Sequence, residues 1–327
     1  MRLLNVDAQT AVAIVVTLAV LTLGALLYGV FRRALADDQP LSWRQGALVI
    51  GAVLTTLTAA PIALNPQNLY FGFFTPNVYH NPTVILMKPS AVALFFAGLA
   101  CFNPKWRPQP LPLWVIGYAL LTAVCLYSKP NFIIAWLPTL ALITLYHLLS
   151  RRPVHWPLLI GGIVLPAGIL LFAQAQSSVV SAGFGFAPFE LYNLWAEFDA
   201  NQDLLLKRIG SILFPLLAYL LYLPQSGRSL TFNAAWLTFF VSSAYADLLI
   251  DLYDPGAGNF IWGAQFGVFL LFVAATAALM RQCRQRSWRD WRLGVIGLAL
   301  AGHTLAGINW YYLHLTRPVW HLLVNVW

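Results

Sequence analysis

The chain has 327 residues, of which 60% are hydrophobic and only 9% are charged. A soluble domain carries about 25% charged residues, so this composition excludes an ordinary soluble enzyme and predicts a polytopic membrane protein. The net charge of +8 does not indicate nucleic-acid binding, because basic residues in such a chain mostly fix its topology in the membrane.

Apolar runs close to the roughly 20 residues that cross a bilayer predict ten transmembrane helices. The fold is therefore expected to be all-α, with one transmembrane domain over residues 1–327. The first run is too long for the core of a signal peptide and is interpreted as a retained helix. The predicted spans are residues 11–31, 45–64, 83–102, 111–127, 131–149, 157–174, 209–224, 232–250, 259–280 and 293–314.

The connections that follow odd-numbered spans carry nearly all the arginine and lysine of the loops, including the run from Arg281 to Arg292. The positive-inside rule places these connections in the cytoplasm and both termini outside it. Most acidic residues fall on or near the opposite side, where the connections are longer and chemically richer. We therefore expect function at the outer face of an integral membrane protein of the bacterial inner membrane.

The connection from Asn65 to Thr83 has no lysine or arginine and is rich in asparagine, proline and aromatic residues. Its aromatic rings suit the membrane interface, so we predict a segment that re-enters the membrane or lies flat on it. His80 is a candidate general base, with an ordinary surface histidine as the alternative. Asn77 and Asn81 are candidate amide ligands for a substrate.

Two lysines lie at the same predicted depth near the outer surface. Lys88 is about five residues inside the third span, where a charge is costly unless it has a partner or reaches water. Lys129 lies between the fourth and fifth spans, beside Asn131, which is a further candidate ligand. The two ammonium groups could clamp a phosphate or diphosphate, and the alternative is that each extends to the interface.

The long connection over residues 175–208 contains a predicted amphipathic helix that lies on the outer membrane surface. Glu190, Asn193 and Glu197 are spaced three and four apart, so they would share one face, which is either a solvated face or a binding face. Arg208 ends this connection on the outer side against the positive-inside trend, which indicates an anionic ligand or a flanking anchor.

Three aspartates near the end of the eighth span, Asp247, Asp251 and Asp254, are spaced four and three apart. On a continuous helix they would form one stripe. Such a stripe could hold a divalent cation, take a proton or bind sugar hydroxyls, unless the helix ends early and the acids lie in water. A tight turn follows, and Asn259 and Trp262 open the ninth span beside it.

Amide, acidic and aromatic groups suit a sugar, whereas lysines at lipid depth suit a lipid phosphate. In this layout the chain resembles the polytopic glycosyltransferases and polysaccharide polymerases of the GT-C class, which use lipid-linked sugar donors. The resemblance implies transfer of a polyprenyl-phosphate-linked sugar at the outer leaflet during cell-envelope polysaccharide biosynthesis. Asp251, Asp247 or Glu197 would then be the base that activates the acceptor hydroxyl. Lys88, Lys129 and Arg208 would hold the leaving lipid phosphate.

Such glycosyltransferases place an acid pair in the first outer loop, and the corresponding connection here has no acid. A transporter or flippase for an anionic or lipid-linked substrate is the alternative function, and a non-catalytic subunit of a polysaccharide assembly complex is another. The expected partners are membrane lipids, the lipid-linked sugar and subunits of such an assembly, without nucleic acid. A divalent cation is compatible with the acids but is not required, and no dedicated metal ligands are predicted.

Overall fold

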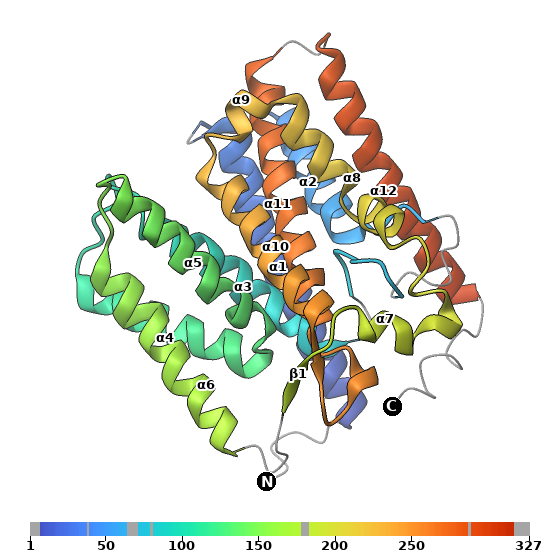
Figure 1. The fold of residues 1–327 in the computed structure, drawn as a ribbon. Coiled ribbons are helices and arrows are strands. Elements are labelled where there is room, and N and C mark those ends of the chain that lie inside the picture. The colour runs from blue at the N-terminus through green and yellow to red at the C-terminus, as the bar shows by residue number, and fades with distance from the viewer. Residues whose placement is uncertain are drawn as a thin grey trace. The chain divides into compact units, whose positions relative to one another are not determined.

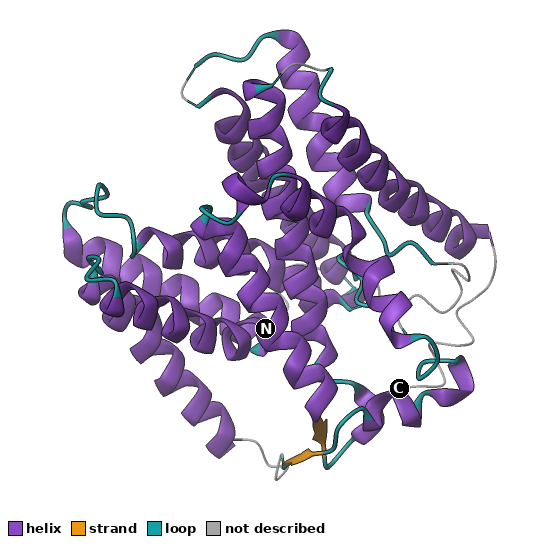
Figure 2. Ribbon diagram, turned by 45° about the horizontal axis from the view of Figure 1, so that its top comes forward, coloured by secondary structure: helices purple, strands orange, loops and turns teal. Residues whose placement is uncertain are grey.

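The computed structural model describes residues 7–37, 39–63, 71–78, 81–177, 183–286 and 289–316. Helices make up most of this part of the chain, and two short strands form an antiparallel pair (Figure 2). The protein is therefore an all-α membrane protein, as the composition predicts. Eight helices within the described ranges are long and apolar enough to cross a bilayer, so the predicted number of ten spans is not confirmed.

The elements follow one another along the chain as labelled in Figure 1. The long helices are α1 (Ala8–Ala36), α2 (Trp43–Thr58), α3 (Pro82–Ala100), α4 (Leu111–Ser128), α5 (Asn131–Leu149), α6 (Leu165–Ser177), α8 (Leu204–Leu221), α10 (Leu230–Leu248), α11 (Ile261–Gln285) and α12 (Trp291–Thr316). The shorter elements are α7 (Glu190–Leu194), α9 (Leu223–Ser226), the π-helix η2 (Pro157–Val164), the 3₁₀ helices η3 (Ala196–Phe198) and η4 (Pro255–Ala257), and the strands β1 (Phe184–Phe186) and β2 (Leu249–Asp251).

The helices group into two compact units. Unit 1 comprises Met1–Gly29 and Val78–Ser177, and within it α4 packs against α3, α5, η2 and α6. Close helix contacts depend on glycine, because a Cβ on Gly98 would lie 2.8 Å from the Trp136 ring. The Thr122 hydroxyl also donates to the Gly162 carbonyl at 3.0 Å, which joins α4 to η2.

Unit 2 comprises Val30–Asn77 and Ser178–Trp327, and α11 is its central helix. Nearly every residue of α11 is buried, because α2, α8, α10 and α12 all pack against it. A helix that is apolar on all sides suits such a position. At Gly267 a Cβ would lie 2.9 Å from the backbone of Phe239, so glycine permits the close approach of α10 and α11.

The predicted span 45–64 is interrupted in the structure. Its helix, α2, has 16 residues and is about 24 Å long, which is shorter than the roughly 30 Å hydrocarbon core. The Asn77 side-chain amide donates to the carbonyls of Thr56 and Ala59, both at 2.9 Å, and so satisfies the end of the helix. The sequence pattern missed this break because the capping amide comes from a distant position.

The segment 71–77 returns through the interior of unit 2. Phe73 is 7% exposed and Phe74 is 1% exposed, so these rings pack in the core and do not form an interfacial aromatic belt. The Phe74 amide donates to the Ser211 hydroxyl at 2.9 Å, which ties the segment to α8. Irregular backbone at membrane depth is tolerated where protein buries it and satisfies its polar groups.

His303 on α12 stabilises the same region. Its Nδ1 donates to the Ala60 carbonyl at 2.7 Å, and its Nε2 accepts from the Phe214 amide at 3.4 Å. The two bonds require one neutral tautomer, with the proton on Nδ1. His303 thus joins α12, α8 and the chain just after α2, and it does so as a structural residue.

Candidate functional site

Four side chains of unit 2 form a polar cluster, which we call the Arg208 cluster: Phe74, Tyr192, Arg208 and Asp247. Arg208 Nη2 forms an ion pair with Asp247 Oδ1 at 2.8 Å and donates a short hydrogen bond to the Tyr192 hydroxyl. The Tyr192 hydroxyl in turn donates to Asp247 Oδ1 at 2.7 Å. The guanidinium carbon lies 3.3 Å from the centre of the Phe74 ring. Ion pair, hydrogen bonds and cation–π contact therefore converge on one arginine.

Local backbone pairing places Tyr192 over Asp247. Beyond the strand pair β1–β2, the Ala187 amide donates to the Leu248 carbonyl at 2.9 Å, and the Phe189 amide donates to the Asp247 carbonyl at 2.7 Å. The chain then turns through Phe189, which has a positive φ of 59°, into the short helix α7. Tyr192 on α7 consequently points at the last turn of α10, which carries Asp247.

The cluster is partly withdrawn from solvent. The side chain of Arg208 is 16% exposed and that of Asp247 is 25% exposed, whereas Tyr192 is fully buried. Burial, with the neighbouring Asp247 carboxylate, raises the pKa of Tyr192 although Arg208 opposes the effect. Tyr192 therefore stays protonated at neutral pH and remains a hydrogen-bond donor to Asp247.

Each member of the ion pair keeps one polar atom without a partner within the described part of the chain. Arg208 Nη1 is buried and makes no hydrogen bond there. The two hydrogen bonds to the Asp247 side chain both end on Oδ1, which leaves Oδ2 available as an acceptor. Arg208 Nη1 is thus an unpaired donor and Asp247 Oδ2 an unpaired acceptor within the described residues. A ligand that carries both an anionic group and a hydroxyl would satisfy both atoms.

The predicted stripe of three aspartates does not exist, because α10 ends at Leu248. Asp247 is at the end of α10, Asp251 is the last residue of β2, and Asp254 precedes η4. The loss of helical geometry after Leu248 removes the common face, so the helix does end early. Of the three acids, however, only Asp254 is exposed, whereas Asp247 and Asp251 are half-buried.

Asp251 organises the turn that follows β2. Its Oδ1 accepts from the amides of Tyr253 and Asp254, and its Oδ2 accepts from the Asn259 side chain at 2.8 Å. Partial burial acts against these bonds, but together they lower the pKa of Asp251. The hollow beside Asp251 and Asn259 has no room for a water molecule. Both oxygens of this candidate base are therefore engaged in holding the turn.

The predicted amphipathic surface helix is much shorter than expected. Helix α7 covers only Glu190–Leu194, because Trp195 leaves helical geometry and a separate 3₁₀ turn follows. Left-handed backbone at Asp199 and Asp203 then interrupts the chain again before α8. Glu190 and Glu197 are exposed, and Glu190 accepts from the Asn193 side chain at 3.3 Å. The single face proposed for these residues is thus broken between α7 and η3.

In unit 1 the structure brings Lys129 to the beginning of α3. Lys129 Nζ lies 3.4 Å from the Thr83 hydroxyl, which donates to Asn81 Oδ1 at 2.7 Å. Asn81 also caps α3 by accepting from the Val84 amide. Burial lowers the pKa of Lys129 to about 8, so the ammonium form predominates at neutral pH.

Lys88 lies five positions after Thr83 on α3 and is 4% exposed. Burial on a helix that is long and apolar enough to span a membrane makes it an unusual position for a lysine. Asn131 is the first residue of α5, directly after the Lys129–Pro130 pair. Lys88 thus shares α3 with Thr83, and Asn131 lies two positions after Lys129 in the chain.

The remaining predicted ligands have other positions. Asn77 caps α2, as described above, and Trp262 is 7% exposed in the first turn of α11. His80 lies outside the described residues. Within those ranges no three His, Cys, Asp or Glu side chains come together as metal ligands.

Two members of the Arg208 cluster were missed by the sequence analysis. Tyr192 lies within the predicted amphipathic helix and was not selected as a candidate, although a buried tyrosine needs a partner for its hydroxyl. Phe74 was treated as an interfacial ring. No sequence signal connects either residue with Arg208, because the contacts span up to 134 positions of chain.

Comparisons with protein-family models, with curated proteins and with solved structures gave no match for this chain.

Proposed function

We propose that this protein is a membrane glycosyltransferase or polymerase that acts at the outer leaflet on a polyprenyl-phosphate-linked sugar in cell-surface glycan assembly. The observation that carries the proposal is the Arg208 cluster, in which Asp247 Oδ2 and Arg208 Nη1 are uncommitted within the described residues. A glycosyl acceptor supplies a hydroxyl that can donate to Asp247 Oδ2. A lipid-phosphate leaving group supplies an anion that can accept from Arg208 Nη1.

In this proposal Asp247 is the general base. Asp247 Oδ2 takes the proton of the acceptor hydroxyl while the oxygen of that hydroxyl forms a bond to the anomeric carbon of the donor sugar. The bond from that carbon to the phosphate oxygen breaks, and the electron pair leaves with the polyprenyl phosphate. Arg208 Nη1 donates to the departing phosphate, because a guanidinium matches phosphate oxygens in charge and geometry.

Tyr192 and Phe74 are positioning residues in the same proposal. The Tyr192 hydroxyl holds Asp247 Oδ1, and the Phe74 ring supports one face of the guanidinium. In unit 1, Lys88 and Lys129 are proposed ligands for a lipid phosphate in their own right, each acting as a point charge and independently of the Arg208 cluster.

The test compares Asp247→Asn with the matched control Asp203→Asn. Asparagine keeps an oxygen that accepts from Tyr192 and Arg208, but it cannot take a proton. Asp203 is exposed and makes no side-chain cap bond, and its left-handed conformation suits asparagine. The full chain would be reconstituted in liposomes with a panel of polyprenyl-phosphate-linked and polyprenyl-diphosphate-linked monosaccharides. Release of the lipid phosphate would be measured.

We expect Asp247→Asn to lower the turnover rate roughly 10²–10⁴-fold, the usual contribution of a general base. Loss of the ion pair with Arg208 should also lower the melting temperature, so activity is compared per folded protein, below the unfolding transition of the variant. Asp203→Asn should stay within about twofold of wild type. Full activity of Asp247→Asn would rule out the assigned base. A wild-type chain that turns over no donor in the panel would contradict the proposed reaction.

One observation favours a second candidate, a transporter or flippase for an anionic or lipid-linked substrate. The interrupted helix α2 and the buried irregular segment after it are features that many transporters use at their substrate sites. Here Asn77 caps the broken end, so the carbonyls of Thr56 and Ala59 are already engaged. Movement of a fluorescent polyprenyl phosphate between leaflets without breakage of a glycosidic bond would favour this candidate.

A further inference from the structure

A cavity lies at the opposite end of unit 2 from the Arg208 cluster. Arg208 is near the beginning of α8 and Tyr222 follows its last residue, so the two ends are about 21 Å apart along the helix. The cavity has a volume of about 70 Å³ measured to water-molecule centres. One water needs roughly 10–15 Å³ on that measure, so the space holds several waters or one small polar group.

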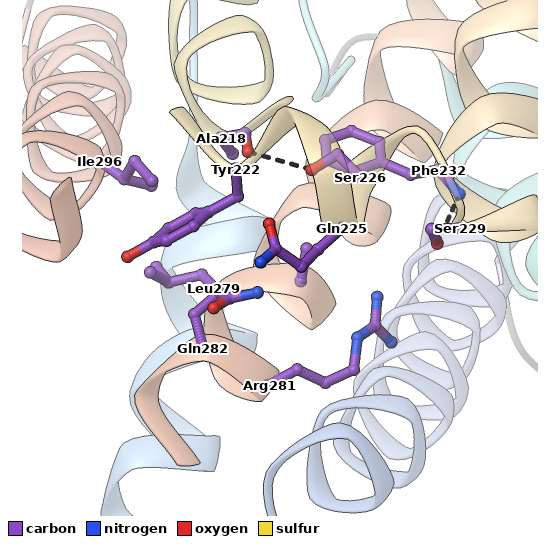
Figure 3. A pocket seen from close by; sticks show the side chains of 11 residues that line it. Ala218, Tyr222, Gln225, Ser226, Ser229, Phe232, Leu279, Arg281, Gln282 and Ile296 are labelled. Atoms are coloured by element: carbon purple, nitrogen blue, oxygen red, sulfur yellow. Dashed lines mark hydrogen bonds between the residues drawn. The ribbon is translucent and has the colours of Figure 1, made fainter. Parts of the chain in front are cut away.

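The cavity wall combines a cation with hydrogen-bonding side chains. Figure 3 shows the amides of Gln225 and Gln282 near the ring of Tyr222, while the Arg281 side chain extends away from them along the other side of the cavity. No acidic residue is among the described residues that line it.

Two of these polar groups lack a partner within the described ranges. Gln282 is 6% exposed, and its side-chain oxygen is buried without a hydrogen bond. A buried acceptor left unsatisfied costs about 1–3 kcal/mol, so a ligand donor at that point is favoured. Arg281 forms no ion pair with the described acids, because Asp37 pairs with Arg284 and Asp290 pairs with Arg292.

The surroundings of the cavity add further positive charge. The guanidinium carbons of Arg286 and Arg292 lie 6.0 and 5.6 Å from the centre of the Tyr222 ring. The Tyr222 hydroxyl donates to Asp290 Oδ2 at 3.1 Å, which places that carboxylate on the far end of the ring. The local balance favours an anion next to Arg281.

We propose that this cavity binds a glycerol-phosphate group, with the phosphate on Arg281 and a hydroxyl donating to Gln282. A glycerol-phosphate group carries an anion that can pair with Arg281 and a hydroxyl that can donate to the Gln282 oxygen, and it is small enough for the cavity. It has two sources, the headgroup of phosphatidylglycerol and soluble glycerol 3-phosphate. The inference does not depend on the reaction proposed for the Arg208 cluster.

The experiment uses the full chain in detergent. Native mass spectrometry would compare retention of phosphatidylglycerol and phosphatidylcholine, and calorimetry would measure binding of sn-glycerol 3-phosphate against glycerol. Arg281→Met removes the charge and keeps most of the side-chain stem. Arg284→Met makes the same change in net charge one turn away, outside the cavity.

We expect Arg281→Met to weaken binding about tenfold and Arg284→Met to stay within twofold. Gln282→Leu is the second variant. It should weaken binding without lowering the melting temperature, because it removes an unsatisfied acceptor. Binding of the lipid alone would assign the headgroup, and binding of the soluble compound alone would assign the metabolite form. The proposal would be overturned if Arg281→Met and Arg284→Met weakened binding equally. It would also be overturned if the wild type preferred neither phosphatidylglycerol over phosphatidylcholine nor sn-glycerol 3-phosphate over glycerol.

Discussion

The two ends of unit 2 use arginine in opposite ways. At the Arg208 cluster, four separate segments of chain converge, and the guanidinium is held by a carboxylate, a hydroxyl and an aromatic ring. At the Tyr222 end, several arginines come from one stretch of sequence, and Arg281 faces a cavity that no acid among the described residues lines. The difference teaches that contacts from distant segments can neutralise one arginine, whereas at the Tyr222 end the ion pairs of Arg284 and Arg292 leave Arg281 without an acid among the described residues.

The Arg208 end of unit 2 should also be the end at which a larger side chain destabilises the fold more, because irregular backbone packs closely against a helix there. At Gly307 on α12, a Cβ would collide with the Thr58 carbonyl and lie 2.8 Å from the Thr58 carbonyl carbon. Gly297, on the same helix but toward the Tyr222 end, has open space around it. We expect Gly307→Ala to lower the free energy of unfolding by about 3 kcal/mol, since backbone cannot move aside as a side chain does.

Gly297→Ala is the control for this substitution. It should be neutral or raise stability by about 0.5–1 kcal/mol, because alanine favours a helix over glycine. Thermal unfolding in detergent would measure both variants. Equal melting temperatures for the two would show that the close approach of α12 to the end of α2 is not needed for stability.

A smaller effect is expected from the ion pair itself. Arg208→Met leaves the Asp247 side chain partly buried, with Tyr192 as its one hydrogen-bond partner in the described part of the chain, and it removes the contact with Phe74. The cost should be about 2 kcal/mol, below that of a fully buried pair because both side chains retain some exposure.

Arg228→Met is the matched change at the other end, where Arg228 is exposed and makes no ion pair with the described acids. It should alter stability by less than about 0.5 kcal/mol. If Arg208→Met and Arg228→Met had the same melting temperature, the Arg208 cluster would stabilise the fold no more than a surface arginine does. That result would remove the distinction drawn between the two ends.

The smallest expected effects are on the pH dependence of stability. The Arg208 end should lose stability as pH falls, and the Tyr222 end should lose stability as pH rises. The pKa of Asp251 is lowered in the folded state, so its bonds contribute stability above the unfolded value near 3.9. That contribution is lost as pH falls through the lower folded pKa. We expect Asp251→Ala to cost about 1 kcal/mol at pH 7 and to approach wild-type stability below pH 4.

At the other end, burial and the Asp290 carboxylate raise the pKa of Tyr222 to about 12. The stability it contributes is complete below the unfolded value near 10 and is lost as pH rises toward 12. Tyr222→Phe should cost about 0.5–1 kcal/mol at pH 8, and the difference from wild type should shrink above pH 10. Melting curves across the two pH ranges measure both residues, and a constant difference for either would contradict the assigned bonds.

Local sequence features determined the membrane class and most helix positions. The predicted spans 111–127 and 131–149 match α4 (Leu111–Ser128) and α5 (Asn131–Leu149) closely, because apolar length and flanking prolines act within each segment. The same features selected Arg208 and Asp247 as candidates, since charges near span ends stand out against an apolar background.

Only the tertiary structure decided which of those candidates meet. Hydropathy could not show that α2 ends at Thr58, because the amide that satisfies its last carbonyls is Asn77, about 20 positions later. It also could not pair Arg208 with Asp247 across 39 positions, or place Tyr192 between them. A span is encoded by its own residues, whereas a site depends on hydrogen bonds and ion pairs that form when distant segments pack together.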